Sequence, residues 1–302
     1  MNCSIIIRTL NEKKNLEILF KLLESQNNKQ FEVILIDSGS TDGTLEFLDK
    51  YNFKFPFKFT NINKTEFSFG RSLNRAITLS TYKDIICCIS AHCFPQDDNF
   101  LSSLIKHFEN NDTGLVYGKQ IPDQRSHLSE ANHLSSWFQD GYLAQPDLFC
   151  NNGCSAFKYD TWNLIKFNED VTGCEDLVFS HELYIKNLKV IYEPKAVVSH
   201  YHNENFRKIF NRYKREAMIV KSFLDFKYSL KTFFKCTTKE ILSDLSFRKN
   251  VSFKRRSLIN IISYRFSKNL GQYLAPKLKD ISPFSLEEKD HNNLLKHYFY
   301  SL

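Results

Sequence analysis

The sequence predicts an α/β protein whose mostly parallel central sheet is flanked by helices. Three observations support this prediction. Continuous apolar runs rich in β-branched residues recur along the first 120 residues, as in strands that are covered on both faces. Segments with helical spacing separate these runs, and the connections between them are short, about two to six residues. The 302 residues, 42% hydrophobic and 25% charged, have ordinary globular composition.

Strands and helices alternate from the N-terminus. The run CSIIIR predicts a first buried strand at 3–8, and Asn11 is in place to cap the helix that follows. That helix has apolar residues at 16, 19, 20 and 23, and a tight polar turn, SGSTDGT, follows the second strand. The remaining elements expected in this half are strands at 31–37, 84–90 and 114–119, and helices through 45–51, from 71 to 80 and from about 98.

The pattern becomes less regular beyond residue 120. Periodicity fades between about 120 and 150, which predicts an irregular segment there. Strand character returns at 151–157, and 173–187 predicts a loop that runs into an amphipathic helix. KVIYE and AVVSHYH predict two further short strands. From residue 203 the sequence is helical and basic through SYRFSKNLGQYLA, and the last 20 residues are polar and expected to be peripheral.

The formal net charge of +7 is concentrated near the C-terminus. Residues 203–281 hold 19 Lys and Arg against 6 Asp and Glu, so the rest of the chain holds 22 (41 minus 19) against 28 (34 minus 6). Aromatic residues are interleaved with the basic ones in FKYSLKTFFK and SFKRRSLINIISYRF. Such a segment suits an anionic membrane surface or nucleic acid, and no nucleic-acid-binding motif supports the second. The alternative is a helical lid with a basic solvated face.

Neither a targeting segment nor a membrane span is apparent in the sequence. MNCSIIIRTLNE lacks a basic leader, and its apolar run is too short for a signal peptide. No stretch approaches the roughly 20 apolar residues of a membrane span. The eight cysteines lack paired CxxC spacing, and CNNGC at 150–154 matches no recognised zinc pattern. We therefore expect reduced, mostly buried thiols and a cytoplasmic protein.

Polar residues follow three of the predicted strands. They are Thr9 to Glu12, Asp37 to Asp42, and Ser90 to His92. Ligands of α/β sheets bind outside the carboxyl ends of the strands. We therefore expect these three groups to lie close together and to form a binding site.

The order of motifs resembles the family 2 glycosyltransferases of the GT-A fold over roughly residues 3–215. SIIIRTLNE, VILIDSGSTDGT, FSFGRSLNRAI, a strand ending in SAHCFP, and a later ED pair carry the resemblance. It implies a GT-A catalytic domain at 1–202, with a nucleotide-binding half at about 1–95 and an acceptor half at about 96–202. A basic helical C-terminal extension, 203–302, would follow.

The resemblance also implies an activity. Such an enzyme moves a sugar from a nucleotide-sugar donor to a hydroxyl of a glycan or lipid-linked acceptor, usually with inversion. We expect a hexosyltransferase that builds a bacterial surface polysaccharide, such as a capsule. With its basic extension it would work in the cytoplasm, in peripheral contact with the inner membrane surface, and would bind no nucleic acid.

The resemblance assigns donor contacts to the strand ends. Asp37 matches the aspartate that accepts a hydrogen bond from the nucleobase, although an Asp before Ser-Gly-Ser can also cap its own turn. Thr9 and Glu12 match the corner that lines the nucleotide pocket, and Glu12 equally suits the start of a helix. The same comparison adds Ser40, Arg71 and Ser90.

Several polar or aromatic residues also have simpler explanations. Arg71 suits a solvated helix start as well as a nucleotide contact. Asp42 is expected to cap a turn or helix, and Asp97 and Asp98 to begin the helix after them. Two aromatic residues either stack on sugar rings or belong to the core, Trp137 and Trp162.

The ED pair is the expected catalytic group. Asp176, preceded by Glu175, matches the family aspartate that removes the acceptor proton as the hydroxyl attacks the anomeric carbon. Both acids also suit the start of the helix LVFSHELYIKN, and the two roles are compatible. NNGCSAF resembles the acceptor-side strand and would place Asn152 and Gly153 near the sugars.

The metal motif departs from the family pattern. Where the family has Asp-x-Asp, this chain has Ser90-Ala91-His92. An Asp-x-His variant occurs in the polypeptide N-acetylgalactosaminyltransferases, whose His binds manganese. The resemblance therefore implies a divalent metal at His92, Mn²⁺ rather than Mg²⁺, because imidazole suits Mn²⁺ better. His200 or His202 would be a second ligand, with His202 slightly favoured. A core histidine and a diphosphate contact are the alternatives for His92.

Two other functions fit the same fold. A nucleotidyltransferase would need a Gly-rich, basic loop after the first strand, and RTLNEKKN contains no glycine. A non-catalytic module that binds nucleotide-sugars or glycans is suggested by the absence of an Asp at position 90. Such a module has no need of the proton acceptor Asp176. The sequence therefore favours the glycosyltransferase.

Overall fold

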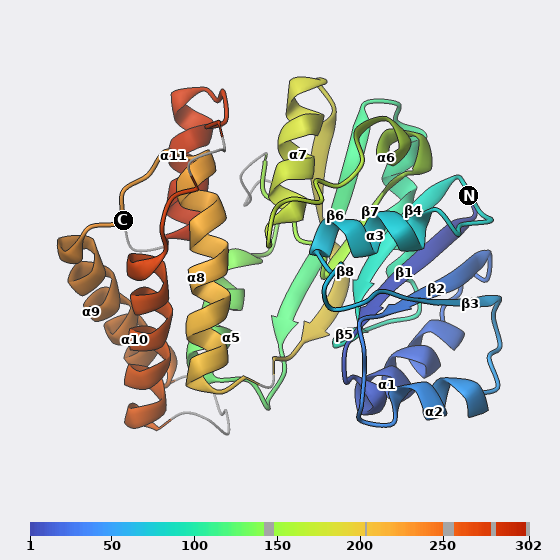
Figure 1. Cartoon of the computed structure of the whole chain (residues 1–302), viewed down its shortest axis with the longest axis horizontal. Helices are drawn as coiled ribbons and strands as arrows, with labels where there is room; N and C mark the ends of the chain where they lie inside the picture. Colours follow the sequence, from blue (N-terminus) through green and yellow to red (C-terminus); the bar gives the residue numbers. More distant parts are fainter. Residues whose placement is uncertain (142–147, 203, 250–256, 279–281, 300–302) are drawn as a thin grey trace. The chain divides into compact units, whose positions relative to one another are not determined.

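The computed structural model describes residues 1–141, 148–202, 204–249, 257–278 and 282–299 (Figure 1). The chain divides into two compact units. Unit 1 comprises Met1–Gln120, Asp140–Val171 and Glu175–His200, and unit 2 comprises Ile121–Gln139, Thr172–Cys174 and Tyr201–Leu302. The last change of unit lies two residues before the boundary expected at 202. Unit 2 also takes in a segment, Ile121–Gln139, that the sequence analysis placed in the first domain.

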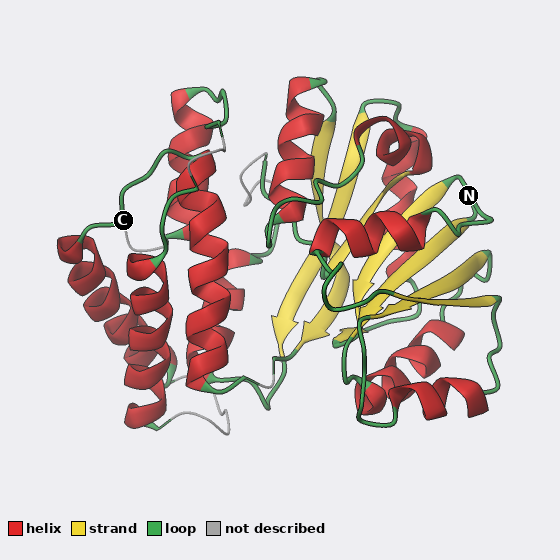
Figure 2. Cartoon of the chain, in the orientation of Figure 1, coloured by secondary structure: helices red, strands yellow, loops and turns green. Residues whose placement is uncertain are grey.

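Unit 1 is built on an eight-stranded sheet with the order β3-β2-β1-β4-β7-β6-β8-β5 (Figure 2). Strands β3, β2, β1 and β4 are parallel, whereas β7 is antiparallel to both β4 and β6, and β5 is antiparallel to β8. The expected α/β fold is confirmed, and its sheet is mixed. The strands are β1 Cys3–Thr9, β2 Phe31–Asp37, β3 Phe57–Asn61, β4 Ile85–Ser90, β5 Cys93–Pro95, β6 Thr113–Pro122, β7 Cys154–Lys158 and β8 Lys189–His200.

The central strands are buried on both faces, as their apolar runs predict. Ile5 and Ile7 of β1 share one core cluster with Leu16 and Phe20 of the first helix. The strand period of two puts Ile6 on the opposite face. The helices of unit 1 are α1 Lys13–Glu24, α2 Thr44–Lys50, α3 Phe69–Ile77, α4 Phe100–Ile105, α6 Tyr159–Ile165 and α7 Glu175–Ile185, with a 3₁₀ helix, η1, at Lys106–Glu109.

Two expectations about the strands and short elements were wrong or incomplete. KVIYE and the AVVSH part of the second segment belong to one strand, β8, which ends at His200. Pro194 interrupts the sequence pattern, but β5 pairs only with Val198–His200, so the missing N–H of the proline costs no bond to β5. The short elements β3, β5 and α6 have too few periodic residues to be recognised from the sequence.

The segment expected to be irregular, about 120 to 150, contains a helix, α5 Leu128–Trp137. Its buried face includes Leu128, Ala131 and Leu134 but also the polar Glu130 and Asn132. Because polar residues occupy part of the buried face, the sequence of this helix lacks a clear helical pattern of apolar residues. Tertiary partners satisfy them, since Asn132 Nδ2 donates to Asp244 Oδ1 at 2.8 Å. Residues 142–147 of the same segment lie outside the described part.

Unit 2 is helical: besides α5 it contains α8 Phe206–Phe223, α9 Leu230–Phe247, α10 Leu258–Leu274 and α11 Glu288–Tyr298. Three of these helices begin at a capping side chain that accepts a backbone N–H, Asn205, Ser229 and Ser257. The C-terminal 20 residues, expected to be peripheral, contain α11, most of whose residues are partly buried and in which Leu294 is fully buried. Among the described helices, none combines the length and apolarity that crossing a bilayer requires.

All eight cysteines are free thiols, and seven of them are buried. Burial raises the pKa of Cys154 to about 12, so this thiol stays protonated at neutral pH. The expectation of buried, unpaired thiols agrees with this arrangement.

Gly118 in β6 gives a test of the sheet packing. A Cβ at this position would lie 2.3 Å from the carbonyl oxygen of Ala196 and 2.5 Å from Sγ of Cys154. The backbone of β8 cannot move away from an added methyl group without disturbing the sheet. We therefore expect Gly118→Ala to lower the free energy of unfolding by about 1–3 kcal/mol in urea titrations.

The matched control is Gly173→Ala, whose nearest neighbour would be the flexible Arg215 side chain, 3.3 Å from the added Cβ. It should change the stability by less than about 1 kcal/mol. Equal effects of the two substitutions would contradict the close approach of β6 and β8.

Candidate active site

The polar residues at the end of β1 organise the candidate site. In the strand register Thr9 lies opposite Asp37 of β2, and Arg8 lies opposite Ser90 of β4. The carbonyl of Thr9 accepts hydrogen bonds from N–H and Oγ of Ser38, at 3.1 and 3.2 Å. The structure thus brings the ends of β1, β2 and β4 together at one edge of the sheet.

An ion pair joins β1 to the start of α7. Nη1 of Arg8 lies 2.9 Å from Oε1 of Glu175 and donates to the carbonyl of Phe69 at 3.2 Å. The guanidinium also lies 4.9 Å from the centroid of the Phe69 ring. Glu175 is buried and Arg8 is largely so. The sequence analysis missed Arg8, although one charged residue in a run of isoleucines signals a buried partner.

Asp176 lies beside this ion pair. Its Oδ2 accepts the backbone N–H of Asn152 at 3.1 Å, and its Oδ1 accepts that of Leu177 at 2.9 Å. Burial raises the pKa of Asp176 to about 7, and the neighbouring charge of Glu175 adds to the increase. The two N–H donors and Arg8 oppose it. The residue as a whole stays partly exposed.

The segment before β7 connects Asp176 to the end of β4. The carbonyl of Gly153 accepts the N–H of Ser90 at 3.1 Å, while the N–H of the preceding Asn152 points to Asp176. Asn152 Nδ2 also lies 3.5 Å from Oε1 of Glu175. The residues of the SAH motif and of the ED pair, 85 positions apart, therefore lie on either side of one short backbone segment.

Asp37 is buried within the turn that follows β2. Its Oδ2 accepts the N–H groups of Gly39 and Ser40 at 2.7 and 2.9 Å, and its Oδ1 accepts the hydroxyl of Ser40. Gly39 has a φ of +99°, which this turn needs and which glycine adopts without strain. Oδ1 keeps capacity for one further hydrogen bond, because a carboxylate oxygen accepts about two. The turn fixes the carboxylate in place.

The hydroxyls of the corner contribute further polar atoms. Ser40 Oγ accepts the N–H of Asn11 at 2.7 Å, which holds the β1 corner against the β2 turn. Thr9 is buried, and within the described residues its Oγ1 has no hydrogen-bond partner. An orphaned hydroxyl at a strand end is consistent with a group that a ligand satisfies.

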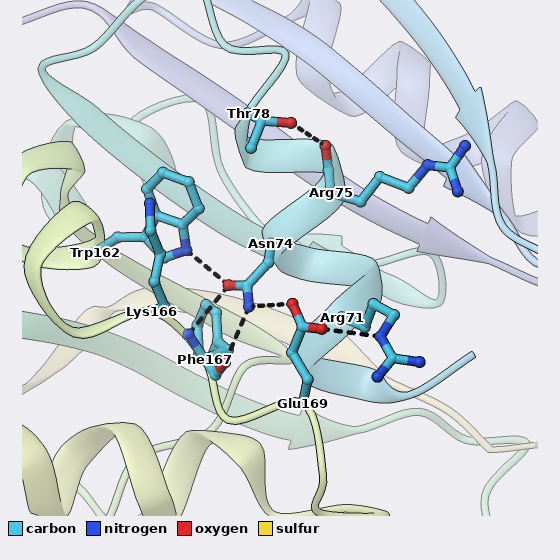
Figure 3. A pocket seen from close by; sticks show the side chains of 8 residues that line it. All are labelled: Arg71, Asn74, Arg75, Thr78, Trp162, Lys166, Phe167 and Glu169. Atoms are coloured by element: carbon cyan, nitrogen blue, oxygen red, sulfur yellow. Dashed lines mark hydrogen bonds and ion pairs between the residues drawn. The ribbon is translucent and has the colours of Figure 1, made fainter. Parts of the chain in front are cut away.

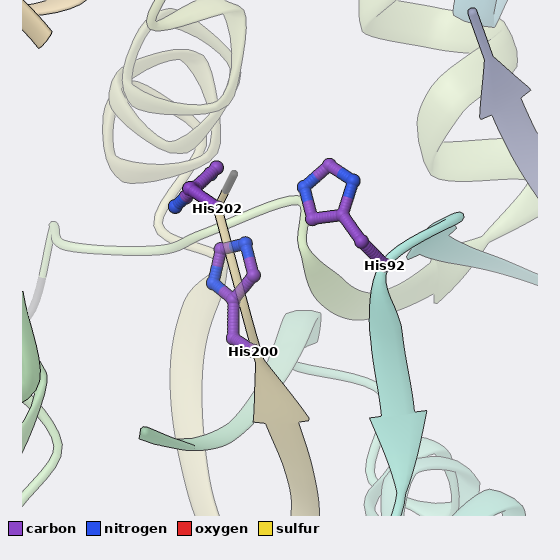
Figure 4. Close-up of side chains that lie close together, drawn as sticks. All are labelled: His92, His200 and His202. Atoms are coloured by element: carbon purple, nitrogen blue, oxygen red, sulfur yellow. The ribbon is translucent and has the colours of Figure 1, made fainter. Parts of the chain in front are cut away.

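Two imidazoles lie next to this corner (Figure 4). Nδ1 of His92 lies 2.8 Å from Oε1 of Glu12, and Nδ1 of His200 lies 2.6 Å from Oε1 of Gln120. The two rings stack with centroids 5.2 Å apart, and their closest candidate ligand nitrogens lie within 4.8 Å of each other. Oxygen partners on both Nδ1 atoms favour the tautomer whose lone pair is on Nε2, the form that binds metals.

His202 belongs to unit 2. Its Nδ1 lies 2.7 Å from Oε1 of Glu130, so this imidazole is also oriented through Nδ1. Strand β8 ends at His200, and the expected alternation of His200 and His202 along one strand is therefore wrong. The structure places His200, the less favoured candidate, against His92.

Arg71 faces a pocket of about 530 Å³ beside α3 and α6 (Figure 3). Its Nε lies 2.8 Å from Oε2 of Glu169, and its Nη1 donates to the carbonyl of Glu66 at 2.9 Å. Trp162 lines the same pocket but is buried and donates to Asn74 at 2.9 Å, so it belongs to the core. The full lining is Arg71, Asn74, Arg75, Thr78, Trp162, Lys166, Phe167 and Glu169.

Asp42 caps a turn, as expected, whereas Asp97 and Asp98 do not begin α4, because its N-cap is Asn99 and its first turn contains no acidic residue. Asp42 Oδ1 accepts the N–H of Thr44 at 3.1 Å at the start of α2. Asp97 Oδ1 accepts the N–H of Asn99 at 2.8 Å just before α4, and Asp98 is exposed next to it. Trp137, in unit 2, donates from Nε1 to the carbonyl of His297 at 2.9 Å.

Comparison with known proteins places this site in context. The model of the family "Glycosyl transferase family 2" matches residues 4–159. The chain is 24% identical over 209 residues to the O-antigen chain rhamnosyltransferase WbaN of Salmonella anatum, a match that covers 64% of each chain, a little under two thirds. It is 24% identical over 224 residues, 70% of each chain, to the O-antigen chain rhamnosyltransferase RfbN of Salmonella typhimurium.

Solved structures with the same fold include two glycosyltransferases. The mannosyltransferase PcManGT of Pyrobaculum calidifontis, in complex with GDP-Man and Mn²⁺, has a TM-score of 0.59 and 16% identity, covering 90% of this chain and 84% of the other. TarS 1–349 of S. aureus, in complex with UDP-GlcNAc, has a TM-score of 0.57 and 16% identity, covering 90% of each chain. At this identity the likeness shows the GT-A fold alone.

The Arg8–Glu175 ion pair can be tested by replacing one or both partners. Arg8→Met leaves a buried carboxylate without its cation, so we expect the free energy of unfolding to fall by about 2–4 kcal/mol. The double variant Arg8→Met/Glu175→Gln removes both charges and should recover at least half of the loss in urea titrations.

The matched control is Arg75→Met, whose guanidinium lies 3.9 Å from Glu66 with both side chains about half exposed. It should change stability by less than about 1 kcal/mol. If Arg8→Met were as harmless as this control, the ion pair would not organise the site.

Proposed function

Because the chain belongs to glycosyl transferase family 2, we propose that it transfers a hexose from a nucleotide-sugar donor to a hydroxyl of a glycan or lipid-linked acceptor, with inversion. The family supports the transferase activity. The O-antigen rhamnosyltransferases among its relatives support a role in building a bacterial surface polysaccharide, such as an O-antigen or capsule. We place the reaction in the cytoplasm, where nucleotide-sugars are made.

The observation that carries this proposal is the position of Asp176. Its carboxyl is held by two backbone N–H groups next to the end of the sheet, and its pKa of about 7 suits a group that takes a proton at neutral pH. We assign Asp176 as the general base that deprotonates the acceptor hydroxyl. One such displacement at the anomeric carbon inverts its configuration.

Glu175 is assigned a positioning role within the catalytic pair. Its carboxylate is engaged by Arg8, and its charge contributes to the raised pKa of Asp176. Glu175 therefore acts on the reaction through its neighbour. Asn152 donates its backbone N–H to Asp176, and we assign residues 151–157 to the acceptor side of the site.

We assign donor binding to the corner formed by β1, β2 and β4. The remaining acceptor capacity of Asp37 suits the N–H of a nucleobase. The hydroxyl of Thr9, which has no partner in the described part of the chain, suits a ligand oxygen or nitrogen. Ser40 and Ser90 flank these groups, and Glu12 orients His92. Arg71 remains a proposed anion contact, limited by its ion pair with Glu169.

We further propose that imidazoles hold a divalent metal, Mn²⁺ rather than Mg²⁺. His92 and His200 fit this role because their Nδ1 atoms are bound to oxygen and their ligand nitrogens lie within 4.8 Å. His202, which the sequence slightly favours as a ligand, is also oriented through Nδ1, and its role as a ligand stays a prediction from the sequence. A metal there would supply positive charge to a donor diphosphate.

Removing the base tests the catalytic assignment. Asp176→Asn keeps the shape but cannot accept the acceptor proton, so we expect kcat to fall by about 10²–10⁴-fold while the Kd of the donor changes by less than about threefold. Nucleotide release from a panel of nucleotide-sugars, with isothermal titration for donor binding, measures both. The control Asp170→Asn, an exposed carboxylate nearby, should leave both unchanged.

The pH profile gives an independent check on the same group. Because the base works only when deprotonated and its pKa is raised to about 7, kcat/KM of the wild type should fall about tenfold per pH unit below pH 7. The residual activity of Asp176→Asn should lack this limb. A wild-type profile that stays flat from pH 7 to pH 5 would contradict the assignment.

The metal proposal predicts direct Mn²⁺ binding. His92→Ala and His200→Ala should each weaken Mn²⁺ binding by at least about tenfold. Electron paramagnetic resonance of free Mn²⁺, without substrates, measures the binding. The control His291→Ala removes an imidazole of α11 and should have no effect. Wild-type protein that binds no Mn²⁺, or an unchanged rate after treatment with chelator, would overturn the proposal.

A further inference from the structure

Helix α10 buries charged residues and exposes large apolar ones. Its buried face includes the charged Arg265 and Lys268, each at most 2% exposed, whereas Ile259, Ile262 and Phe266 are 74%, 44% and 48% exposed. These three apolar residues follow the spacing i, i+3, i+7 and so form one stripe on the helix. A typical surface helix of a globular protein buries its large apolar residues and exposes its charged ones.

The buried charges fix the rotation of α10 against α9. Arg265 forms a two-pronged pair with Asp244, with distances of 2.7 Å from Nε to Oδ2 and 2.6 Å from Nη2 to Oδ1. Its Nη1 lies 3.2 Å from Oε2 of Glu240, and Nζ of Lys268 lies 2.5 Å from Oε1 of the same residue. Turning the apolar stripe inward would break these pairs, at a cost the stripe could not offset.

Helix α9 extends the apolar stripe into a wider surface. Phe233 packs between the exposed Phe234 and Phe266, with ring centroids 5.0 and 5.7 Å away. Leu230 and Leu242 of α9 are exposed as well. We call this surface the outer face of α9 and α10 (both visible in Figure 1); it comprises Leu230, Phe234, Leu242, Ile259, Ile262 and Phe266.

The exposed charged residues of α9 and α10 are all basic. Lys231, Lys235 and Lys239 are exposed and lie one turn apart along α9. Glu240 and Asp244, the acidic residues of α9, are both buried in the pairs described above, and α10 contains no acidic residue. The described surface of the two helices therefore joins large apolar side chains to cations, with no exposed carboxylate.

We infer that the outer face of α9 and α10 docks on a lipid bilayer that carries anionic headgroups. Aliphatic and aromatic side chains enter the interface while lysines meet phosphates, which is how amphipathic helices lie on membranes. A second copy of the chain is a poorer occupant, because it would bring an identical lysine row against this one. The inference rests on the proposed function and deepens it, because a protein docked on a bilayer would meet a lipid-linked acceptor there.

Sedimentation with vesicles tests the inference on the full chain without donor or acceptor. Vesicles of about 70% phosphatidylcholine and 30% phosphatidylglycerol should bind the protein at least tenfold more tightly than pure phosphatidylcholine. Raising the salt from about 0.1 to 0.5 M should weaken binding severalfold, because it screens the lysine–phosphate attraction.

Two sets of substitutions separate the apolar and charged contributions. Ile262→Ser/Phe266→Ser and Lys231→Gln/Lys235→Gln/Lys239→Gln should each reduce vesicle binding at least tenfold, with unchanged circular dichroism. All five residues are exposed, so the fold should tolerate both variants. The control Leu164→Ser/Ile185→Ser removes two exposed apolar residues of unit 1 and should bind like the wild type.

Several outcomes would overturn the inference. They are wild-type protein that ignores both vesicle types, variants that bind as well as the control, and self-association in sedimentation velocity that the Ile262→Ser/Phe266→Ser substitutions abolish. The last would assign the face to a second copy. Because vesicle binding is measured without substrates, a failed membrane test leaves donor turnover unaffected, and a failed transferase assay leaves membrane binding unaffected.

Discussion

The ion pair between Arg8 and Glu175 is the interaction on which the candidate site depends. Arg8 lies in the central strand of the parallel half of the sheet, and Glu175 opens α7, 167 residues later. Burying either the guanidinium or the carboxylate without its partner would destabilise the fold, so the two groups have to be buried together. This mutual requirement fixes where α7 begins and therefore where Asp176 lies.

The same pair sets the electrostatics of Asp176. The adjacent carboxylates of Glu175 and Asp176 repel each other, and Arg8 pairs directly with only the first of them. Asp176 is left with backbone N–H donors, which offset its burial only in part, and its pKa rises to about 7. The repulsion that would destabilise an ordinary core thereby prepares a carboxylate to accept a proton near neutral pH.

Buried polar groups held by specific partners recur in both units. Glu12 and Gln120 orient the imidazoles of His92 and His200 in unit 1. In unit 2, Glu240 and Asp244 hold Arg265 and turn the apolar side of α10 outward. In each case hydrogen-bond geometry, rather than apolar burial, decides which side chain faces a ligand or a partner surface.

The sequence by itself determined the elements with a strong local period and the polar ends that follow them. The strands at 3–9, 31–37 and 85–90, the helix packed through Leu16 and Phe20, and the turn after Asp37 were predictable, because neighbouring residues fix the alternation of side chains. The motif order also pointed to the family.

Only the tertiary structure decided which distant groups meet. Nothing near Arg8 specifies Glu175, and nothing near His92 specifies Glu12, 80 residues away, or His200. The antiparallel half of the sheet and the helix at Leu128–Trp137 were likewise hidden, because their polar residues are satisfied by partners that a local pattern does not contain. The local pattern of apolar residues predicts which side of a helix or strand is buried. The role of a buried charge or amide, in contrast, depends on the atom with which it forms a hydrogen bond, and that atom lies far away in the sequence.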